Sequence, residues 1–215
     1  PSDFVFKLPD NVSYADGAMI EPLAVGLQAA EKAKIIPGES ALVMGCGPIG
    51  LVIALTALAG GCSKVFIADI VSKKLEMCKN YNNLIPIDLN KDNPAEIVKK
   101  NTNNWGANII FEASGATKAY DVIFDSICPA GKVVIVGNPM NSIPMDFATL
   151  LTKEIEIKTV FRYAHQYERA INLLSSNKID VKPMITDTVA FDDSIKAFER
   201  AAKNLPEDVK IQIQL

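Results

Sequence analysis

Short apolar runs alternate with segments of helical length through the middle of the chain. Buried strands are predicted at residues 40–45, 64–69, 84–88, 108–113 and 131–137, and residues 154–160 alternate as a sixth strand at a sheet end would. Helices are predicted between them at residues 48–60, 72–81, 93–100 and 116–128. Ser72 is expected to cap the second helix, and Pro94 takes the first position of the third. The fold class is therefore α/β, with a six-stranded parallel, doubly wound Rossmann sheet.

The two ends of the chain do not continue this alternation of strands and helices. Residues 14–34 predict a helix interrupted near Pro22. The segment after residue 160 predicts a helix at 166–176, a strand at 185–189, a helix at 193–203 and a last strand at 209–215. The last strand alternates with a period of two and has no partner in the predicted sheet. We therefore assign it to a second domain.

A glycine-rich turn joins the first predicted strand to the following helix. The motif is Gly45-x-Gly47-x-x-Gly50, and its position between a strand and a helix gives it meaning. Gly45 allows the tight turn, Gly47 lets a pyrophosphate approach the backbone, and Gly50 lets the helix pack against the strand. The free N–H groups and dipole of the helix N-terminus favour phosphate, and Pro48 sacrifices no helical hydrogen bond there. The turn predicts a dinucleotide site.

Asp69 decides between the two nicotinamide cofactors. It ends the second predicted strand, 24 residues after Gly45, where the adenosine ribose is expected. A carboxylate there accepts hydrogen bonds from the ribose hydroxyls and repels the 2′-phosphate of NADP, so NAD is predicted. Lys73 and Lys74 follow, and they soften the exclusion of NADP. Two further strand ends are expected to touch the cofactor, namely Ser114-Gly115 and Val136-Gly137-Asn138.

Composition and charge narrow the function classes. The 215 residues carry a net charge of −3 with no basic tract, which argues against a nucleic-acid partner. The longest apolar run, residues 49–60, is shorter than the roughly 18 residues of a membrane helix. The first residues resemble neither a signal nor a transit peptide. We expect a cytoplasmic protein with no membrane partner.

Metal-ligating residues are few and scattered. The four cysteines, at spacings of 16, 16 and 50 residues, fit no zinc knuckle and are expected to be reduced, buried thiols; they are Cys46, Cys62, Cys78 and Cys128. His165 is the one histidine. A three-histidine metal site and a Ser-His-Asp triad with a spare base are therefore not expected.

Several motifs together resemble the polyol branch of the zinc-dependent medium-chain dehydrogenases, the group of the sorbitol and xylitol dehydrogenases. They are the opening Lys7-Leu8-Pro9-Asp10-Asn11-Val12-Ser13, then Glu21-Pro22-Leu23-Ala24-Val25-Gly26, then the glycine turn with its Pro48-Ile49, and finally Phe161-Arg162-Tyr163. The match runs through essentially the whole chain, which resembles roughly the last three-fifths of a family member. The resemblance implies an NAD-dependent oxidation of a polyol substrate.

The resemblance also assigns roles by position. Glu21 matches a glutamate beside the family zinc, and Arg162 and Tyr163 match residues that reach the polyol hydroxyls. The residues that match or are expected to make cofactor contacts are Gly45, Gly47, Pro48, Ile49, Gly50, Asp69, Lys74, Ser114, Gly115, Val136, Gly137, Asn138, Val160, Phe161 and Arg162. Gln28 and Asp187 stand where relatives often have histidine, which weakens any proton relay inferred by analogy.

The zinc-binding part of the family has no counterpart in this sequence, so zinc is not expected to bind here. The family comparison divides the chain into a catalytic-domain remnant with a lead-in helix at 1–25, an NAD-binding domain at 26–160 and a returning segment at 161–215. We expect the NAD-binding portion of a polyol dehydrogenase, inactive as this chain alone. A naturally shortened NAD(H)-binding homologue and a structural protein that kept only the fold stay open. Apolar faces left without the partner domain predict a homo-oligomer, with edge pairing near residues 154–160.

Overall fold

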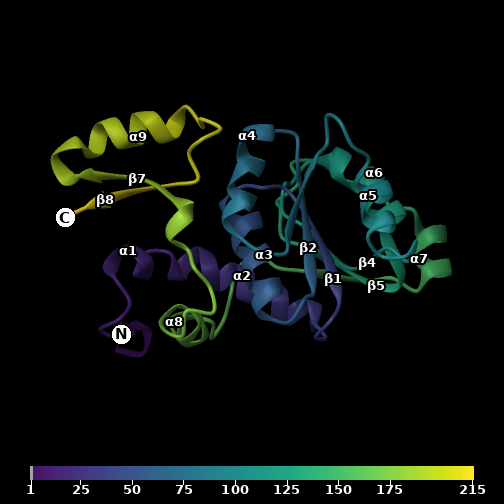
Figure 1. The fold of residues 1–215 in the computed structure, drawn as a ribbon, viewed down its shortest axis with the longest axis horizontal. Coiled ribbons are helices and arrows are strands. Elements are labelled where there is room, and N and C mark those ends of the chain that lie inside the picture. The colour runs from purple at the N-terminus through teal and green to yellow at the C-terminus, as the bar shows by residue number, and fades with distance from the viewer. Residues whose placement is uncertain (1) are drawn as a thin grey trace.

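Six parallel strands form the large sheet of the computed structural model, which describes residues 2–215 (Figure 1). Their spatial order is β3-β2-β1-β4-β5-β6. The strands are β1 (Ser40–Met44), β2 (Lys64–Asp69), β3 (Leu84–Asp88), β4 (Ala107–Glu112), β5 (Ile127–Ile135) and β6 (Glu156–Thr159). The order reverses between β1 and β4, and in such a sheet the ligand crevice lies at the carboxyl ends of those two strands. The predicted α/β doubly wound sheet is confirmed.

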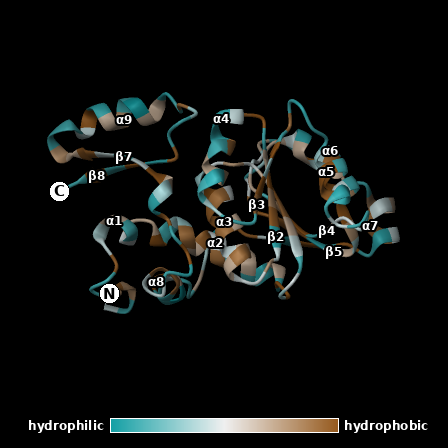
Figure 2. Cartoon of the chain, in the orientation of Figure 1, coloured by the Kyte–Doolittle hydropathy of each residue, from teal (hydrophilic) through white to brown (hydrophobic). Residues whose placement is uncertain are grey.

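Helices cover both faces of this sheet. One face carries α2 (Ile20–Ala33), α3 (Pro48–Ala59), α4 (Ser72–Leu75) and α8 (Tyr167–Ser175). The other carries α5 (Pro94–Lys100) and α6 (Tyr120–Ser126), and α7 (Phe147–Lys153) lies beside them at the far end of the molecule in Figure 1. Side chains of successive strand residues alternate between two separate cores, one on each face. Figure 2 shows hydrophobic residues concentrated in the strands between these layers.

The C-terminal residues form a small unit apart from the large sheet. Strands β7 (Ile185–Ala190) and β8 (Lys210–Gln214) pair in parallel, and α9 (Ser194–Ala202) connects them. The expectation that the last strand lies outside the central sheet is confirmed. Ile195 and Phe198 of α9 remain exposed. In Figure 1 this unit, α1 (Tyr14–Gly17) and both termini lie on the side away from α5, α6 and α7.

Several predicted element boundaries were wrong for local reasons. The N-terminal helix breaks at Ala18 and Met19, and Pro22 sits in the first turn of α2, where its missing N–H costs no helical bond. Ser72 is the first residue of α4 and Val71 takes the cap position, while the Ser72 hydroxyl donates to Asp88 at 2.7 Å. The predicted helix to Cys128 ends at residue 126, since the chain already enters β5.

Short 3-10 helices and turns complete the chain. They are η1 (Ser2–Phe4), η2 (Glu76–Asn80), η3 (Thr117–Ala119), η4 (Lys182–Met184) and η5 (Phe191–Asp193). No helix among residues 2–215 is both long enough and apolar enough to pass through a bilayer.

Candidate cofactor and substrate site

The glycine-rich turn has the geometry that its sequence predicts. Gly45 has a φ of 106°, which glycine adopts without strain. A Cβ at Gly50 would lie 1.9 Å from the carbonyl oxygen of Gly45, so only glycine lets α3 start this close to β1. A Cβ at Gly47 would meet no protein atom within 4 Å. The space above Gly47 is therefore open to a ligand.

Asp69 at the end of β2 is bonded directly to this turn. Its Oδ2 accepts a hydrogen bond of 2.7 Å from the backbone N–H of Cys46, and its Oδ1 accepts one of 2.8 Å from Val71. Each carboxylate oxygen keeps a further lone pair for a ligand hydroxyl. The two amides hold the carboxylate in one orientation, as ribose recognition requires.

A cavity of about 760 Å³ lies at the carboxyl ends of β1, β2 and β4. Five of the residues predicted to contact the cofactor line it: Gly45, Gly47, Asp69, Lys74 and Ser114. The segment that follows β3 forms the outer wall of this cavity. It is held against the end of β2 by the side-chain amide of Asn90, which donates to the carbonyl oxygen of Ile70 at 2.5 Å. Sequence reasoning missed this wall, since no motif marks residues 89–93.

Asp88 holds this outer wall in place. Its carboxylate accepts hydrogen bonds from Ser72 and from the backbone N–H of Asn90, and it forms an ion pair of 3.0 Å with Lys91. These donors, with Ser72 as the largest contribution, hold the pKa of Asp88 well below its usual range. The wall therefore depends on an ionised Asp88.

A second cavity, of about 440 Å³, lies between the ends of β5 and β6. It is lined by the other group of predicted cofactor residues, Val136, Gly137, Asn138, Val160 and Phe161. The remaining predicted contacts line neither cavity: Pro48, Ile49, Gly50, Gly115 and Arg162. Ile49 packs partly into the core, and Gly115 lies between the two cavities, against Asn138.

Glu21 and Tyr163 meet although 142 residues separate them in sequence. The Tyr163 hydroxyl donates to Glu21 Oε1 at 2.9 Å and lies 3.1 Å from the Tyr167 hydroxyl. The hydrogen bond with Tyr167 contributes most to raising the pKa of Tyr163, and partial burial and the Glu21 carboxylate add to it. Tyr163 therefore stays a protonated hydrogen-bond donor at neutral pH.

Arg162 lies apart from this pair. Its guanidinium stands over the ring of Phe161, 5.5 Å from the ring centre, and both side chains are exposed. The two positions where relatives often have histidine have structural partners. Gln28 accepts from the backbone N–H of Ala164 at 3.2 Å, and Asp187 pairs with Arg200 at 2.5 Å.

The residues of the described chain do not fit a catalytic zinc. No group of three or more His, Cys, Asp or Glu side chains within residues 2–215 is arranged to hold a metal. Cys46, in the glycine turn, is fully buried, and its thiol donates to the carbonyl oxygen of Lys74 at 3.4 Å. A hydrogen bond with Cys78, followed by burial, raises the pKa of Cys46. Cys46 therefore offers no exposed sulfur to a metal ion.

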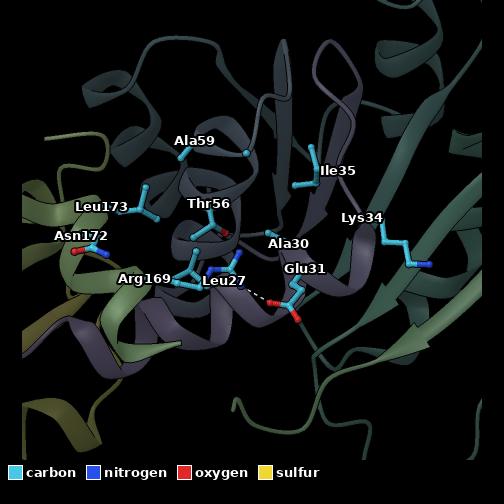
Figure 3. A pocket seen from close by; sticks show the side chains of 11 residues that line it. Leu27, Ala30, Glu31, Lys34, Ile35, Thr56, Ala59, Arg169, Asn172 and Leu173 are labelled. Atoms are coloured by element: carbon cyan, nitrogen blue, oxygen red, sulfur yellow. Dashed lines mark hydrogen bonds and ion pairs between the residues drawn. The ribbon is translucent and has the colours of Figure 1, made fainter. Parts of the chain in front are cut away.

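A third hollow, of about 510 Å³, lies between α2, α3 and α8 (Figure 3). Lys34 and Gly60 on its rim precede β1 and β2, so it lies at the sheet edge opposite the glycine turn. Figure 3 shows Arg169 of α8 paired with Glu31 of α2. This hollow shares no lining residue with the two cavities described above, so it is not part of the candidate site.

Comparison with known proteins identifies the family of this chain. The zinc-binding dehydrogenase family matches residues 48–176. A putative D-xylulose reductase of Agrobacterium fabrum (strain C58) is 47% identical over 99% of this chain and 61% of its own length. The sorbitol dehydrogenase of Bacillus subtilis (strain 168) is 34% identical over 98% of this chain and 60% of its own length. The chain thus spans about 60% of the length of these curated relatives.

The fold comparison points the same way. The crystal structure of ECK1772, an Escherichia coli oxidoreductase/dehydrogenase of unknown specificity, superposes with a TM-score of 0.92 at 31% identity. The superposition covers 100% of this chain and 62% of that one. The chain belongs to the zinc-binding dehydrogenase family, in the polyol branch that includes xylulose reductases and sorbitol dehydrogenases.

Proposed function

We propose that this chain is the NAD(H)-binding portion of a polyol dehydrogenase of the sorbitol and xylitol type. The observation that carries the proposal is the bond between the Asp69 carboxylate and the Cys46 amide, beside the open space above Gly47. It joins a ribose-binding carboxylate to a pyrophosphate-binding turn in a single cavity of about 760 Å³. One relative is named a putative D-xylulose reductase and the other a sorbitol dehydrogenase, which supports a polyol substrate.

The residues of the chain would divide the cofactor between them. Asp69 holds the adenosine ribose, and the N–H groups at the start of α3 face the pyrophosphate. Val136 to Asn138 and Val160 to Phe161 shape the cavity for the nicotinamide. When bound, NAD supplies a hydride acceptor for the secondary alcohol of the substrate. These residues fix the position of the ring and exclude water from its neighbourhood.

Glu21 and Tyr163 form the substrate side of the proposed site. Their hydrogen bond places a carboxylate and a phenol next to each other, two residues along the chain from Phe161. The remaining lone pairs of the Glu21 carboxylate accept hydrogen bonds from polyol hydroxyls. The single O–H of Tyr163 is donated to Glu21, so it reaches a polyol oxygen only when that bond is exchanged. Arg162, which is exposed, adds further donors. No step is assigned to zinc, because the described residues do not fit that metal.

Domain organisation, location and assembly are part of the same proposal. We assign residues 1–25 and 161–215 to segments that complete a catalytic domain, and residues 26–160 to the NAD-binding domain. The four cysteines are free and buried, which supports a reducing, cytoplasmic location. The exposed Ile157 on the edge strand β6, with Phe147 and Leu151 on α7, supports a homo-oligomer.

Titration of the purified chain with NADH tests the proposal. We expect saturable binding, followed through nicotinamide fluorescence, with weaker binding of NADPH. With zinc, NAD and sorbitol or xylitol added, we expect no turnover from this chain alone. Absence of NADH binding would contradict the cofactor site. Oxidation of either polyol would contradict the claim that the site is incomplete.

A further inference from the structure

Glu112 is a fully buried carboxylate in the middle of the large sheet. It ends β4 and lies in register with Met44 of β1 and Ile135 of β5. It forms no ion pair with any residue of the described chain, 2–215. A buried charge without a counter-charge must be stabilised by hydrogen bonds. The donors that serve it show what this carboxylate does.

Five hydrogen-bond donors converge on this one residue. Its Oε1 accepts from the backbone N–H of Ser114 at 2.9 Å, from the Ser114 hydroxyl at 2.5 Å and from the backbone N–H of Gly115 at 3.0 Å. Its backbone carbonyl oxygen accepts from the N–H groups of Val136 and Gly137, both at 2.8 Å. Glu112 therefore fastens the segment after β4 to the segment after β5.

These two segments lie on the boundary between the two cavities. Ser114 lines the cavity beside Asp69, whereas Gly137 and Asn138 line the cavity between β5 and β6. The packing leaves no spare room. A Cβ on Gly137 would lie 2.3 Å from the backbone nitrogen of Gly115 and 2.5 Å from Glu112 Oε2. The shape of the second cavity thus depends on Glu112, which holds the segment of Gly137 and Asn138 that lines it.

We propose that Glu112 is a positioning residue for the nicotinamide half of the cofactor. The inference rests on the proposed NAD(H) site. Glu112 acts through Gly115 and Gly137 and does not need to touch the cofactor. Asp69 is anchored separately, through its own bonds to Cys46 and Val71, so the contact proposed for the adenosine ribose does not depend on Glu112, although Ser114 borders the same cavity.

A carboxylate suits this position better than a neutral amide. Three donors reach Oε1, and an ionised oxygen accepts them more strongly than an amide oxygen does. Glu112→Gln keeps the length and shape of the side chain but removes the charge. In E112Q the donors of Ser114 and Gly115 face either the neutral amide oxygen, which accepts more weakly, or the amide NH₂ group, which cannot accept at all. Either orientation weakens the bonds that hold the Ser114–Gly115 segment.

The test compares NADH with AMP, which lacks the nicotinamide half. For E112Q we expect the dissociation constant of NADH to rise about tenfold, because bonds to a charged acceptor are lost. We expect AMP affinity, measured by calorimetry, to stay within about twofold of wild type. Asp16→Asn is the matched control, since Asp16 is also a buried carboxylate that accepts a serine hydroxyl at 2.7 Å, from Ser13. D16N is expected to leave both affinities unchanged.

Gly137→Ala gives a second test that keeps the carboxylate. Its Cβ would push the two segments apart, so G137A is expected to weaken NADH and spare AMP in the same way. Should E112Q fail to fold, G137A tests whether the spacing of the two segments controls NADH binding. Unchanged NADH affinity, or an equal loss for NADH and AMP, would overturn the positioning role. Failure of the wild-type chain to bind NADH would instead contradict the proposed function.

Discussion

The Asp69 carboxylate accepts a hydrogen bond of 2.7 Å from the backbone amide of Cys46. The residue proposed to select the ribose therefore also braces the turn proposed to bind the pyrophosphate. A substitution at position 69 should affect both contacts, and a substitution in the turn should affect the orientation of the carboxylate.

Replacing Asp69 with alanine should weaken NAD relative to NADP. Loss of charge-assisted bonds to the ribose costs about 1.5–3 kcal/mol, or roughly 10–100-fold in affinity. Removal of the charge also relieves repulsion of the 2′-phosphate. Titration of D69A with NADH and NADPH measures the change. Asp92→Asn, on the rim of the same cavity, is the control and should keep the wild-type preference. An unchanged preference in D69A would refute the assigned role.

Two alanine substitutions in the glycine turn should differ in effect: one should lower stability and the other should lower NADH affinity. Gly50→Ala forces a Cβ to within 1.9 Å of the Gly45 carbonyl oxygen, and such overpacking costs about 1–3 kcal/mol of stability. Gly47→Ala meets no protein atom within 4 Å, so stability should change by less than about 0.5 kcal/mol. Its methyl group occupies the space above the turn, so NADH binding should fall. Denaturant unfolding and NADH titration of both variants separate the effects; equal stability losses would disprove the distinction.

Asp88 should make stability depend on pH in a defined direction. Its pKa is lowered in the folded protein, so its contribution is complete above the unfolded pKa of about 3.9 and disappears as pH falls through the folded pKa. Asp88→Asn should therefore be less stable than wild type at pH 7, and the difference should shrink as the pH falls below about 4. Urea unfolding at several pH values measures this, with D92N as a control. A difference independent of pH would show that ionisation of Asp88 is not involved.

The edge strand β6 should mediate self-association. Ile157 is 36% exposed there, and a lysine at this position opposes pairing of two sheet edges. Ile157→Lys should shift the chain toward monomer in sedimentation or light scattering at a concentration where wild type associates. Ile195→Lys, on the exposed face of α9, is the matched variant. Dissociation by I195K alone would assign the contact to α9, and a strictly monomeric wild type would refute self-association.

The sequence was sufficient for the large sheet and for the glycine turn and the carboxylate that form part of the candidate cofactor site. Gly45 and Gly50 are set by backbone geometry, and Asp69 follows an apolar strand at a fixed distance from the turn. These signals are local, so they can be read without coordinates. Helix α7 gave no such signal, because Phe147 and Leu151 are exposed and bury no periodic face.

The rest of the site depends on contacts distant in sequence. Glu112 lies within the strand predicted at residues 108–113 and was not singled out. Three of its donors come from the neighbouring Ser114 and Gly115, but the two that reach its backbone oxygen, from Val136 and Gly137, meet it only when β4 and β5 pair. Asn90 closes the wall of the cavity by reaching back 20 residues to Ile70. Ser72 was expected to be a cap, but it is the first helical residue, and its hydroxyl donates to Asp88, 16 residues away.

The close contact between α2 and α3 has a mechanical consequence. A Cβ on Gly26 would lie 2.7 Å from the carbonyl oxygen of Val52, so the two helix backbones meet with no side chain between them. Glu21 lies at the start of α2, and the glycine turn opens α3. Because the two backbones touch, a shift of α3 is expected to carry α2 with it, so the position of Glu21 is coupled to that of the glycine turn.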